Sequence, residues 1–122
     1  MDDRELLESI IDILGDRARD DCAFVPCGRS CMAVTTDMLH TKTDFLPGMT
    51  DWQCGWMAAA VTLSDIAAKG AAPRYLLLAV GLDRPERRRP VMEGARACCD
   101  RYGTEIIGGD IDSHDELTLV SI

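Results

Sequence analysis

The stretch Tyr75-Leu-Leu-Leu-Ala-Val-Gly-Leu82 is a continuous apolar run that lies between Pro73 and Pro85. Its length and its lack of a helical period predict a strand that is buried on both sides. Helical patterns flank it over 51–69 and 86–102. A strand between two helices in the chain is typical of a sheet that is covered by helices.

Shorter strands are predicted on either side of this centre. Residues 21–25 and 30–37 are joined by the turn signal Pro26-Cys27-Gly28-Arg29, which predicts a hairpin. Residues 104–107 and 116–122 give two more strands after the last helix. The sheet therefore draws its strands from both halves of the chain.

An amphipathic helix opens the chain, with apolar residues at helical spacing between Leu6 and Leu14 and with Gly15 at its end. The full order is helix, two strands, helix, strand, helix and two strands. It predicts an α/β (α+β) domain with a mixed β-sheet covered by helices on one face. The other face also needs a cover, and a second copy of the chain is the most economical one.

The 122 residues suit one domain. The last apolar residues, Leu117-Thr-Leu-Val-Ser-Ile122, lie inside a strand pattern with no turn signal after them. We therefore expect more protein downstream of Ile122.

Acidic residues outnumber basic ones by 21 to 13, which gives a formal net charge of −8. This balance argues against binding to nucleic acid or to an anionic membrane. The acidic start of the chain lacks the features of a secretory signal. The six cysteines include the adjacent pair Cys98-Cys99 and no Cys-x-x-Cys spacing, which favours reduced core thiols and a cytoplasmic protein.

Carboxylates and hydroxyls gather at one end of the predicted hairpin. If the turn is centred near Gly28, antiparallel pairing places residues whose numbers sum to about 56 opposite one another, so Asp21 faces Thr35. Asp20 then faces Thr36, and Asp37 follows in the same strand. Such carboxylates repel one another unless a cation lies among them, and oxygen ligands favour a hard cation such as Mg²⁺. The alternative is a solvated strand end.

Asp65 lies near the carboxyl end of the helix predicted over 51–69, where the helix dipole disfavours a carboxylate. Small apolar neighbours on this helix indicate tight packing around it. Asp65 is therefore either a metal ligand or the partner of Lys69 in an i,i+4 ion pair.

Gly108-Gly109-Asp110 follows the strand predicted over 104–107. Paired glycines after a strand allow a ligand to approach the backbone, although the same residues also make an ordinary turn. The sequence contains neither a P-loop nor a dinucleotide fingerprint, so any nucleotide must be held through metal ions.

Four segments of this chain occur in the order seen in thiamine-monophosphate kinases. They are Asp20-Asp21-Cys22-Ala23, Val34-Thr-Thr-Asp-Met-Leu39, Leu63-Ser-Asp-Ile-Ala-Ala-Lys-Gly-Ala71 and Ile107-Gly-Gly-Asp110. The chain resembles the archaeal branch most, through Asp37-Met-Leu-His-Thr-Lys-Thr-Asp-Phe45 and Pro47-Gly-Met-Thr50. The resemblance extends over nearly the whole chain.

The resemblance implies ATP-dependent phosphorylation of thiamine phosphate to thiamine diphosphate. It also implies the amino-terminal domain of the aminoimidazole ribonucleotide synthetase-like fold, in which the sheets of two protomers pair into a barrel. The homodimer would then form through the open sheet face. Several Mg²⁺ ions and ATP as co-substrate belong to the same expectation.

The resemblance also implies site residues. The Mg²⁺ ligands would be Asp21, Thr35, Thr36, Asp37, Asp65 and Asp110. Gly109 and Asp110 would contact ATP, and Asp44, where many relatives have a substrate-contacting histidine, would meet thiamine phosphate. No general base is assigned, because phosphoryl transfer depends on positioning and charge neutralisation more than on a strong base.

Members of the family are longer, and their carboxy-terminal domain contributes to the nucleotide and substrate sites. We therefore expect residues 1–122 to be the amino-terminal Mg-ATP-binding and dimerisation domain, inactive alone, with the carboxy-terminal domain absent from this chain. Arg19, Lys69 and Ile111 depart from the family pattern without removing a ligand. The alternatives are another enzyme of the superfamily, such as aminoimidazole ribonucleotide synthetase, selenophosphate synthetase or a hydrogenase-maturation enzyme, or a non-catalytic dimerisation module.

Overall fold

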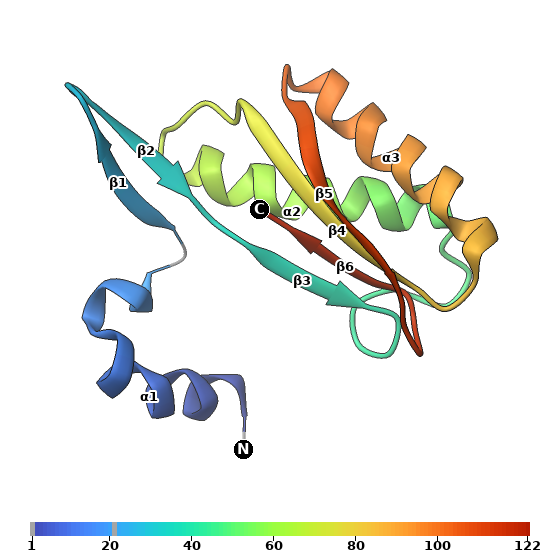
Figure 1. The fold of residues 1–122 in the computed structure, drawn as a ribbon, viewed down its shortest axis with the longest axis horizontal. Helices are drawn as coiled ribbons and strands as arrows, with labels where there is room; N and C mark the ends of the chain where they lie inside the picture. Colours follow the sequence, from blue (N-terminus) through green and yellow to red (C-terminus); the bar gives the residue numbers. More distant parts are fainter. Residues whose placement is uncertain (1, 21) are drawn as a thin grey trace.

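A computed structural model describes the chain except for residues 1 and 21 and the side chains of residues 17 and 18. Figure 1 shows the order of its helices and strands. The elements are α1 (Asp3–Leu14), η1 (Asp16–Arg19), β1 (Ala23–Cys27), β2 (Ser30–Val34), β3 (Asp37–His40), α2 (Asp51–Ala68), β4 (Tyr75–Leu82), η2 (Pro85–Arg87), α3 (Arg88–Arg101), β5 (Glu105–Ser113) and β6 (Thr118–Ser121).

The main sheet has four strands in the order β3-β6-β4-β5. β4 and β5 are parallel and are connected through α3, whereas β6 is antiparallel to both β3 and β4. α2 and α3 pack side by side on the same face of the sheet (Figure 1). The prediction of a mixed sheet with helices on one face is confirmed.

The two covering helices approach each other through glycines. A Cβ atom on Gly55 of α2 would lie 1.9 Å from the carbonyl oxygen of Val91, and one on Gly94 of α3 would lie 1.9 Å from that of Trp52. Neither position has room for a side chain. The glycines therefore permit backbone contact between α2 and α3, which holds them as one layer.

β4 lies inside the sheet, and its side chains alternate in burial. Leu76, Leu78 and Val80 are buried under the helices, whereas Tyr75 and Leu77 are exposed on the open face. The prediction that this strand is buried on both sides is thus wrong for the chain by itself. The open face of this strand therefore carries apolar side chains that the chain itself leaves exposed.

The hairpin of β1 and β2 differs from the prediction in its register and in where it ends. Ala23 pairs with Val34, so paired residue numbers sum to 57, one more than predicted. β2 ends at Val34, and Asp37 begins a separate strand, β3, that pairs with β6. The predicted single strand 30–37 is wrong here, because Asp37–His40 pairs with β6, which is distant in sequence, and so belongs to the main sheet.

β5 is longer than predicted and continues through the two glycines to Ser113. The ladder with β4 shifts by one residue between Leu76 and Leu77, and then runs in register to the end of both strands. A Cβ atom on Gly109 would lie 1.9 Å from the carbonyl oxygen of Leu78. The glycine therefore serves a close approach between two strands, which a pattern of turn residues does not reveal.

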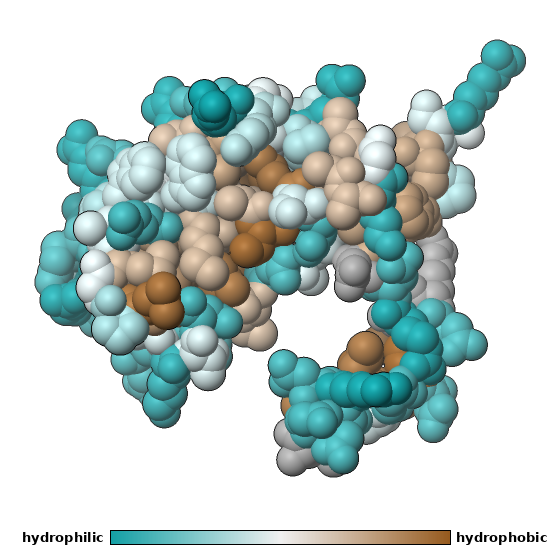
Figure 2. Space-filling model, turned by 180° about the vertical axis from the view of Figure 1, so that it is seen from behind, coloured by the Kyte–Doolittle hydropathy of each residue, from teal (hydrophilic) through white to brown (hydrophobic). Residues whose placement is uncertain are grey.

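α1 forms a separate lobe beside the main body (Figure 2). Asp2 and Glu5 cap it reciprocally, and it ends at Gly15 as predicted. Only Ile11 of this helix is buried, while Ile13 and Leu14 are exposed. Among the described residues, no helix is long and apolar enough to cross a membrane.

Candidate functional site

Asp37 lies at the start of β3 in a row of residues that crosses the sheet. Its cross-strand partner is Ser121 on β6, and Ser121 in turn pairs with Leu78 on β4. Ser121 and Leu78 are buried on the helix-covered face. Asp37 itself is half-buried, and its Oδ2 atom is fully buried. A carboxylate of the predicted ligand set is therefore built into the edge of the core.

A buried pair of hydroxyls connects this row to α2. The Oγ1 atom of Thr62 and the Oγ atom of Ser121 form a hydrogen bond, and both residues are almost completely buried. Thr35, in the short link between β2 and β3, is also buried. Thr62 and Ser121 lay outside the predicted site, because only the tertiary contact between α2 and β6 brings them together.

Asp65 lies one helical turn after Thr62, in the last turn of α2, and is half-buried. The Cys22 thiol donates a hydrogen bond to its carbonyl oxygen at 3.5 Å. Lys69 forms an ion pair with Asp20 at 3.0 Å. These contacts place Asp20 and Cys22 at the end of α2. Asp21, the first predicted ligand, lies outside the described residues.

The donor chemistry of this region fits a hard cation. Asp37 and Asp65 supply carboxylate oxygens, and Thr35 and the exposed Thr36 supply hydroxyls from the β2–β3 link. An all-oxygen donor set is what Mg²⁺ prefers. The described residues contain no group of three or more His, Cys, Asp or Glu side chains close enough to hold a metal. A complete site therefore needs donors beyond these two carboxylates.

Gly109 and Asp110 lie on β5, at the opposite edge of the sheet from β3. Gly109 pairs with Leu78, and Asp110 pairs with Ala79. Three strand spacings separate β3 from β5, about 14 Å at the usual spacing of strands. Because neighbouring residues of a strand point to opposite faces, the row of Asp110 is directed to the open face and that of Asp37 to the helices. Within one chain, the structure does not bring these two carboxylates together.

Asp44 closes the turn that follows β3. Its Oδ2 atom accepts hydrogen bonds from the backbone N–H of His40 at 2.9 Å and from the Thr43 hydroxyl at 3.1 Å. The Nδ1 atom of His40 lies 3.0 Å from Glu116 Oε1, and the other Glu116 oxygen accepts from the Lys42 N–H. Asp44 thus has a structural role in this turn, apart from the substrate contact that was predicted.

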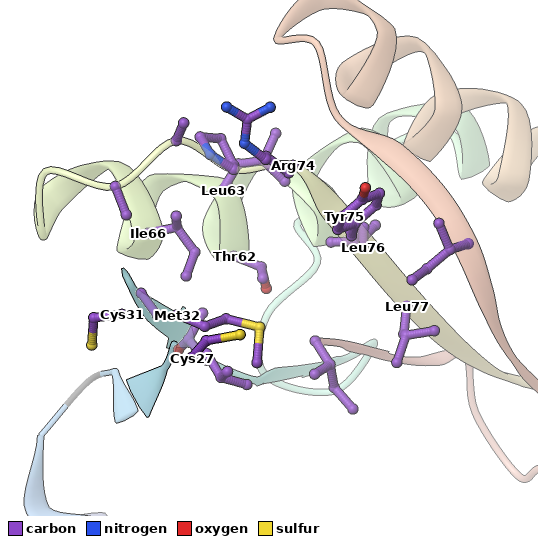
Figure 3. A pocket seen from close by; sticks show the side chains of 18 of the residues that line it. Cys27, Cys31, Met32, Thr62, Leu63, Ile66, Arg74, Tyr75, Leu76 and Leu77 are labelled. Carbon is purple, nitrogen blue, oxygen red and sulfur yellow. The ribbon is translucent and has the colours of Figure 1, made fainter. Parts of the chain in front are cut away.

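A largely apolar groove opens between the hairpin, the end of α2 and the open face of the sheet. Its volume is about 630 Å³. In Figure 3, Thr62 and Ile66 line it from α2, Cys27 and Met32 from the hairpin, and Leu77 from β4. Thr35 also lines the groove, so the groove adjoins the region of the candidate ligands.

Arg87 is a nearly buried cation at the far end of β4. It pairs with Asp51 at the start of α2 at 3.0 Å and with Asp83 at 2.9 Å. Burial on its own would raise the pKa of Asp83, but its hydrogen bonds with Arg87 and the charge of Arg87 outweigh burial and lower it. This cluster ties α2 to the sheet and lies apart from the candidate ligands.

Three thiols are buried between α2 and α3. Burial raises the pKa of Cys54, Cys98 and Cys99, that of Cys99 to about 11. A thiol with a raised pKa stays neutral and is a poor metal ligand. These three cysteines and the buried Cys22 are core residues as predicted, whereas Cys27 and Cys31 in the hairpin are exposed, so the prediction of core thiols is wrong for those two.

The fold and the placement of these residues match a known protein family. The model of the family described as AIR synthase related protein, N-terminal domain, matches residues 19–122. The chain belongs to this family. The match begins at the end of η1, so all candidate ligands lie within the AIR synthase related domain.

Curated relatives that match most of the chain are named thiamine-monophosphate kinase. The chain is 55% identical to the protein of Methanospirillum hungatei over 99% of this chain and 43% of that protein. It is 39% identical to the protein of Archaeoglobus fulgidus, over 88% of this chain and 36% of the relative. The chain thus spans less than half the length of these curated relatives.

Solved structures share this fold over almost the whole chain. AaThiL complexed with AMPPCP and TMP matches with a TM-score of 0.90 and 25% identity, over 98% of this chain and 40% of that one. A HypE–HypF complex matches with a TM-score of 0.77 at 21% identity, over 95% of this chain and 40% of that one. The second match concerns the fold alone.

Proposed function

We propose that this chain is the amino-terminal domain of an enzyme that transfers the γ-phosphoryl group of ATP to thiamine phosphate and yields thiamine diphosphate. The observation that carries the proposal is the 55% identity to a thiamine-monophosphate kinase across 99% of the chain. The similarity to AaThiL, which was solved with AMPPCP and TMP, adds support from the fold. The remainder of the nucleotide site and of the thiamine phosphate site would come from a carboxy-terminal domain, so residues 1–122 alone are inactive.

In this proposal, several Mg²⁺ ions are held by oxygen donors of this domain. The proposed ligands are Asp21, Thr35, Thr36, Asp37, Asp65 and Asp110. Bound Mg²⁺ supplies charge neutralisation to the phosphoryl oxygens of ATP. Asp37 suits its role because cross-strand pairing fixes its backbone and the core surrounds one of its oxygens. Fixed carboxylates need no reorganisation during the reaction.

Gly109 and Asp110 are proposed to contact ATP from the opposite edge of the sheet. Because β3 and β5 are opposite edges of the sheet, we propose that Asp110 contacts a different part of the nucleotide than Asp37 and Asp65. The hydrogen bonds of Asp44 with His40 and Thr43 use its Oδ2 atom, so Oδ1 is the atom that we propose meets thiamine phosphate. No side chain of this domain is assigned as a general base.

We also propose a cytoplasmic homodimer that forms through the open sheet face, with the sheets of two protomers paired into a barrel. The support is the exposure of apolar side chains on this face. They include Met38 (64% exposed), Tyr75 (64%), Leu77 (37%), Ile107 (55%) and Ile122 (44%). Burial of such a patch against its own copy removes apolar surface from water, which favours association.

An acceptor screen tests the proposed substrate. The full-length protein is incubated with Mg²⁺ and radiolabelled ATP, and with either thiamine phosphate or the acceptors of other enzymes of this fold. We expect transfer of label to thiamine phosphate alone. Transfer to a different acceptor would assign the chain to another activity of the superfamily, and an absence of nucleotide binding by calorimetry would indicate a non-catalytic dimerisation module.

A further inference from the structure

Two buried hydroxyls stand out in the interface between α2 and the sheet. Thr62 is 2% exposed and Ser121 is 1% exposed, and they hydrogen-bond to each other. The same interface otherwise buries apolar residues such as Ala59 and Leu119. A hydroxyl costs free energy when it leaves water, and an internal hydrogen bond only offsets that cost. Valine at position 62 and alanine at position 121 would fill nearly the same space without the cost of burying hydroxyls.

The two hydroxyls lie between the elements that carry Asp37 and Asp65. Ser121 is the cross-strand partner of Asp37, and Thr62 precedes Asp65 by one turn of α2. The hydrogen bond therefore joins the strand beside one carboxylate to the helix that carries the other. Contacts between methyl groups have no preferred direction, whereas a hydrogen bond has a preferred geometry. The Thr62–Ser121 bond therefore restricts the position of α2 along β6.

We propose that Thr62 and Ser121 are positioning residues for Mg²⁺ binding, because their hydrogen bond fixes the placement of Asp65 relative to Asp37. The inference rests on the proposed function, in which these two carboxylates are Mg²⁺ ligands. Neither hydroxyl is assigned as a ligand. Their contribution is comparable to that of outer groups that orient metal ligands, whose loss lowers metal affinity by about 10- to 100-fold.

The test measures Mg²⁺ binding without turnover. The full-length protein is titrated with Mg²⁺ by calorimetry in the presence of a non-hydrolysable ATP analogue, and thermal unfolding is measured without metal. We expect Thr62→Val to weaken Mg²⁺ binding about tenfold and to lower the unfolding temperature modestly, because valine has the same shape but leaves the buried Ser121 hydroxyl without this hydrogen bond. Thr62→Ser keeps the hydroxyl and should retain near-native affinity.

Thr104→Val provides the matched control. Thr104 is also a buried threonine, and its hydroxyl donates to the Pro73 carbonyl at 2.7 Å, away from both carboxylates. It should leave Mg²⁺ affinity unchanged. If Thr62→Val does not fold, Ser121→Ala removes the same hydrogen bond with a smaller change of volume, and it should weaken Mg²⁺ binding to a similar extent.

Native Mg²⁺ affinity in folded Thr62→Val or Ser121→Ala would overturn the inference, as would an equal loss in Thr104→Val. The proposed function fails in a different way. If the wild type binds Mg²⁺ with the analogue but does not phosphorylate thiamine phosphate, the substrate is wrong, and the comparison of variants still decides the positioning role. A wild type that binds no Mg²⁺ would overturn both.

Discussion

Asp37 of β3 and Ser121 of β6 face each other across an antiparallel ladder, and Thr62 holds the serine hydroxyl from α2. A carboxylate is thereby fixed at the edge of the core, with one oxygen fully buried. Strand pairing and helix packing, which are requirements of the fold, place the charge where we propose that it binds Mg²⁺.

Asp37→Asn and Asp65→Asn should each lower the turnover of the full-length protein by about 100-fold or more, because each removes a charge that we assign to metal binding. The amide has nearly the same size as the carboxylate, so the unfolding temperature should change little. Steady-state kinetics at several Mg²⁺ concentrations measures the effect. Asp12→Asn on the exposed face of α1 is the control and should be fully active. Wild-type turnover in Asp37→Asn or Asp65→Asn would remove that residue from the proposed site.

Leu77→Asp should convert the proposed dimer into a monomer. The side chain lies on the open face of β4, where a second sheet would bury it, and a buried unpaired carboxylate opposes association. Sedimentation equilibrium measures the change, and circular dichroism reports whether the monomer is folded. Ile13→Asp is the matched control, since Ile13 is 81% exposed on α1. A dimer that persists in Leu77→Asp would contradict the proposed interface.

Stability should fall at acidic pH through Asp83. Its pKa is lower in the folded chain than in the unfolded chain, since Arg87 stabilises the carboxylate more than burial disfavours it. A lowered folded pKa contributes stability above the unfolded pKa of about 4, and that contribution is lost as pH falls through the folded value. Thermal unfolding measured from pH 7 to pH 3 should show this decline, and Asp83→Asn should have a shallower one. Identical pH profiles would show that the Arg87 pair contributes nothing.

Gly55→Ala should destabilise the protein by about 1–3 kcal/mol or more, because its new Cβ atom would meet the backbone oxygen of Val91 and push α2 and α3 apart. Gly28→Ala in the hairpin turn tests a different cost, since its Cβ atom would meet nothing within 4 Å but its φ is +60°. Denaturant unfolding compares the two. An unchanged stability of Gly55→Ala would mean that the helices are less closely packed than described.

Local patterns predicted the helices and the central strand well. Thr50 and Gly70 flank α2, and an unbroken apolar run marks β4, so short-range signals suffice for them. β3 was missed because its four residues have no pattern of their own and become a strand only by pairing with β6. The glycines of β5 were predicted to follow the strand, not to lie within it, for a similar reason, since the carbonyl of Leu78 that requires Gly109 belongs to a different strand.

The candidate site was predictable to a more limited extent. The sequence analysis identified Asp37 and Asp65 as candidate ligands, and the fold connects the strand of one to the helix of the other through Ser121 and Thr62. Nothing in the sequence indicated the hydroxyl pair, because a threonine in a helix and a serine in a strand are common. Only the packing of α2 on β6 brings them together. The local role of Asp44 was equally hidden, since its partners are fixed by the turn after β3.

The most direct measurement of the central claim is product formation by the full-length protein. With ATP, Mg²⁺ and thiamine phosphate, chromatography should detect thiamine diphosphate and ADP in equal amounts, and removal of Mg²⁺ by a chelator should stop the reaction. A folded protein that binds ATP but forms no thiamine diphosphate at any Mg²⁺ concentration would contradict the account.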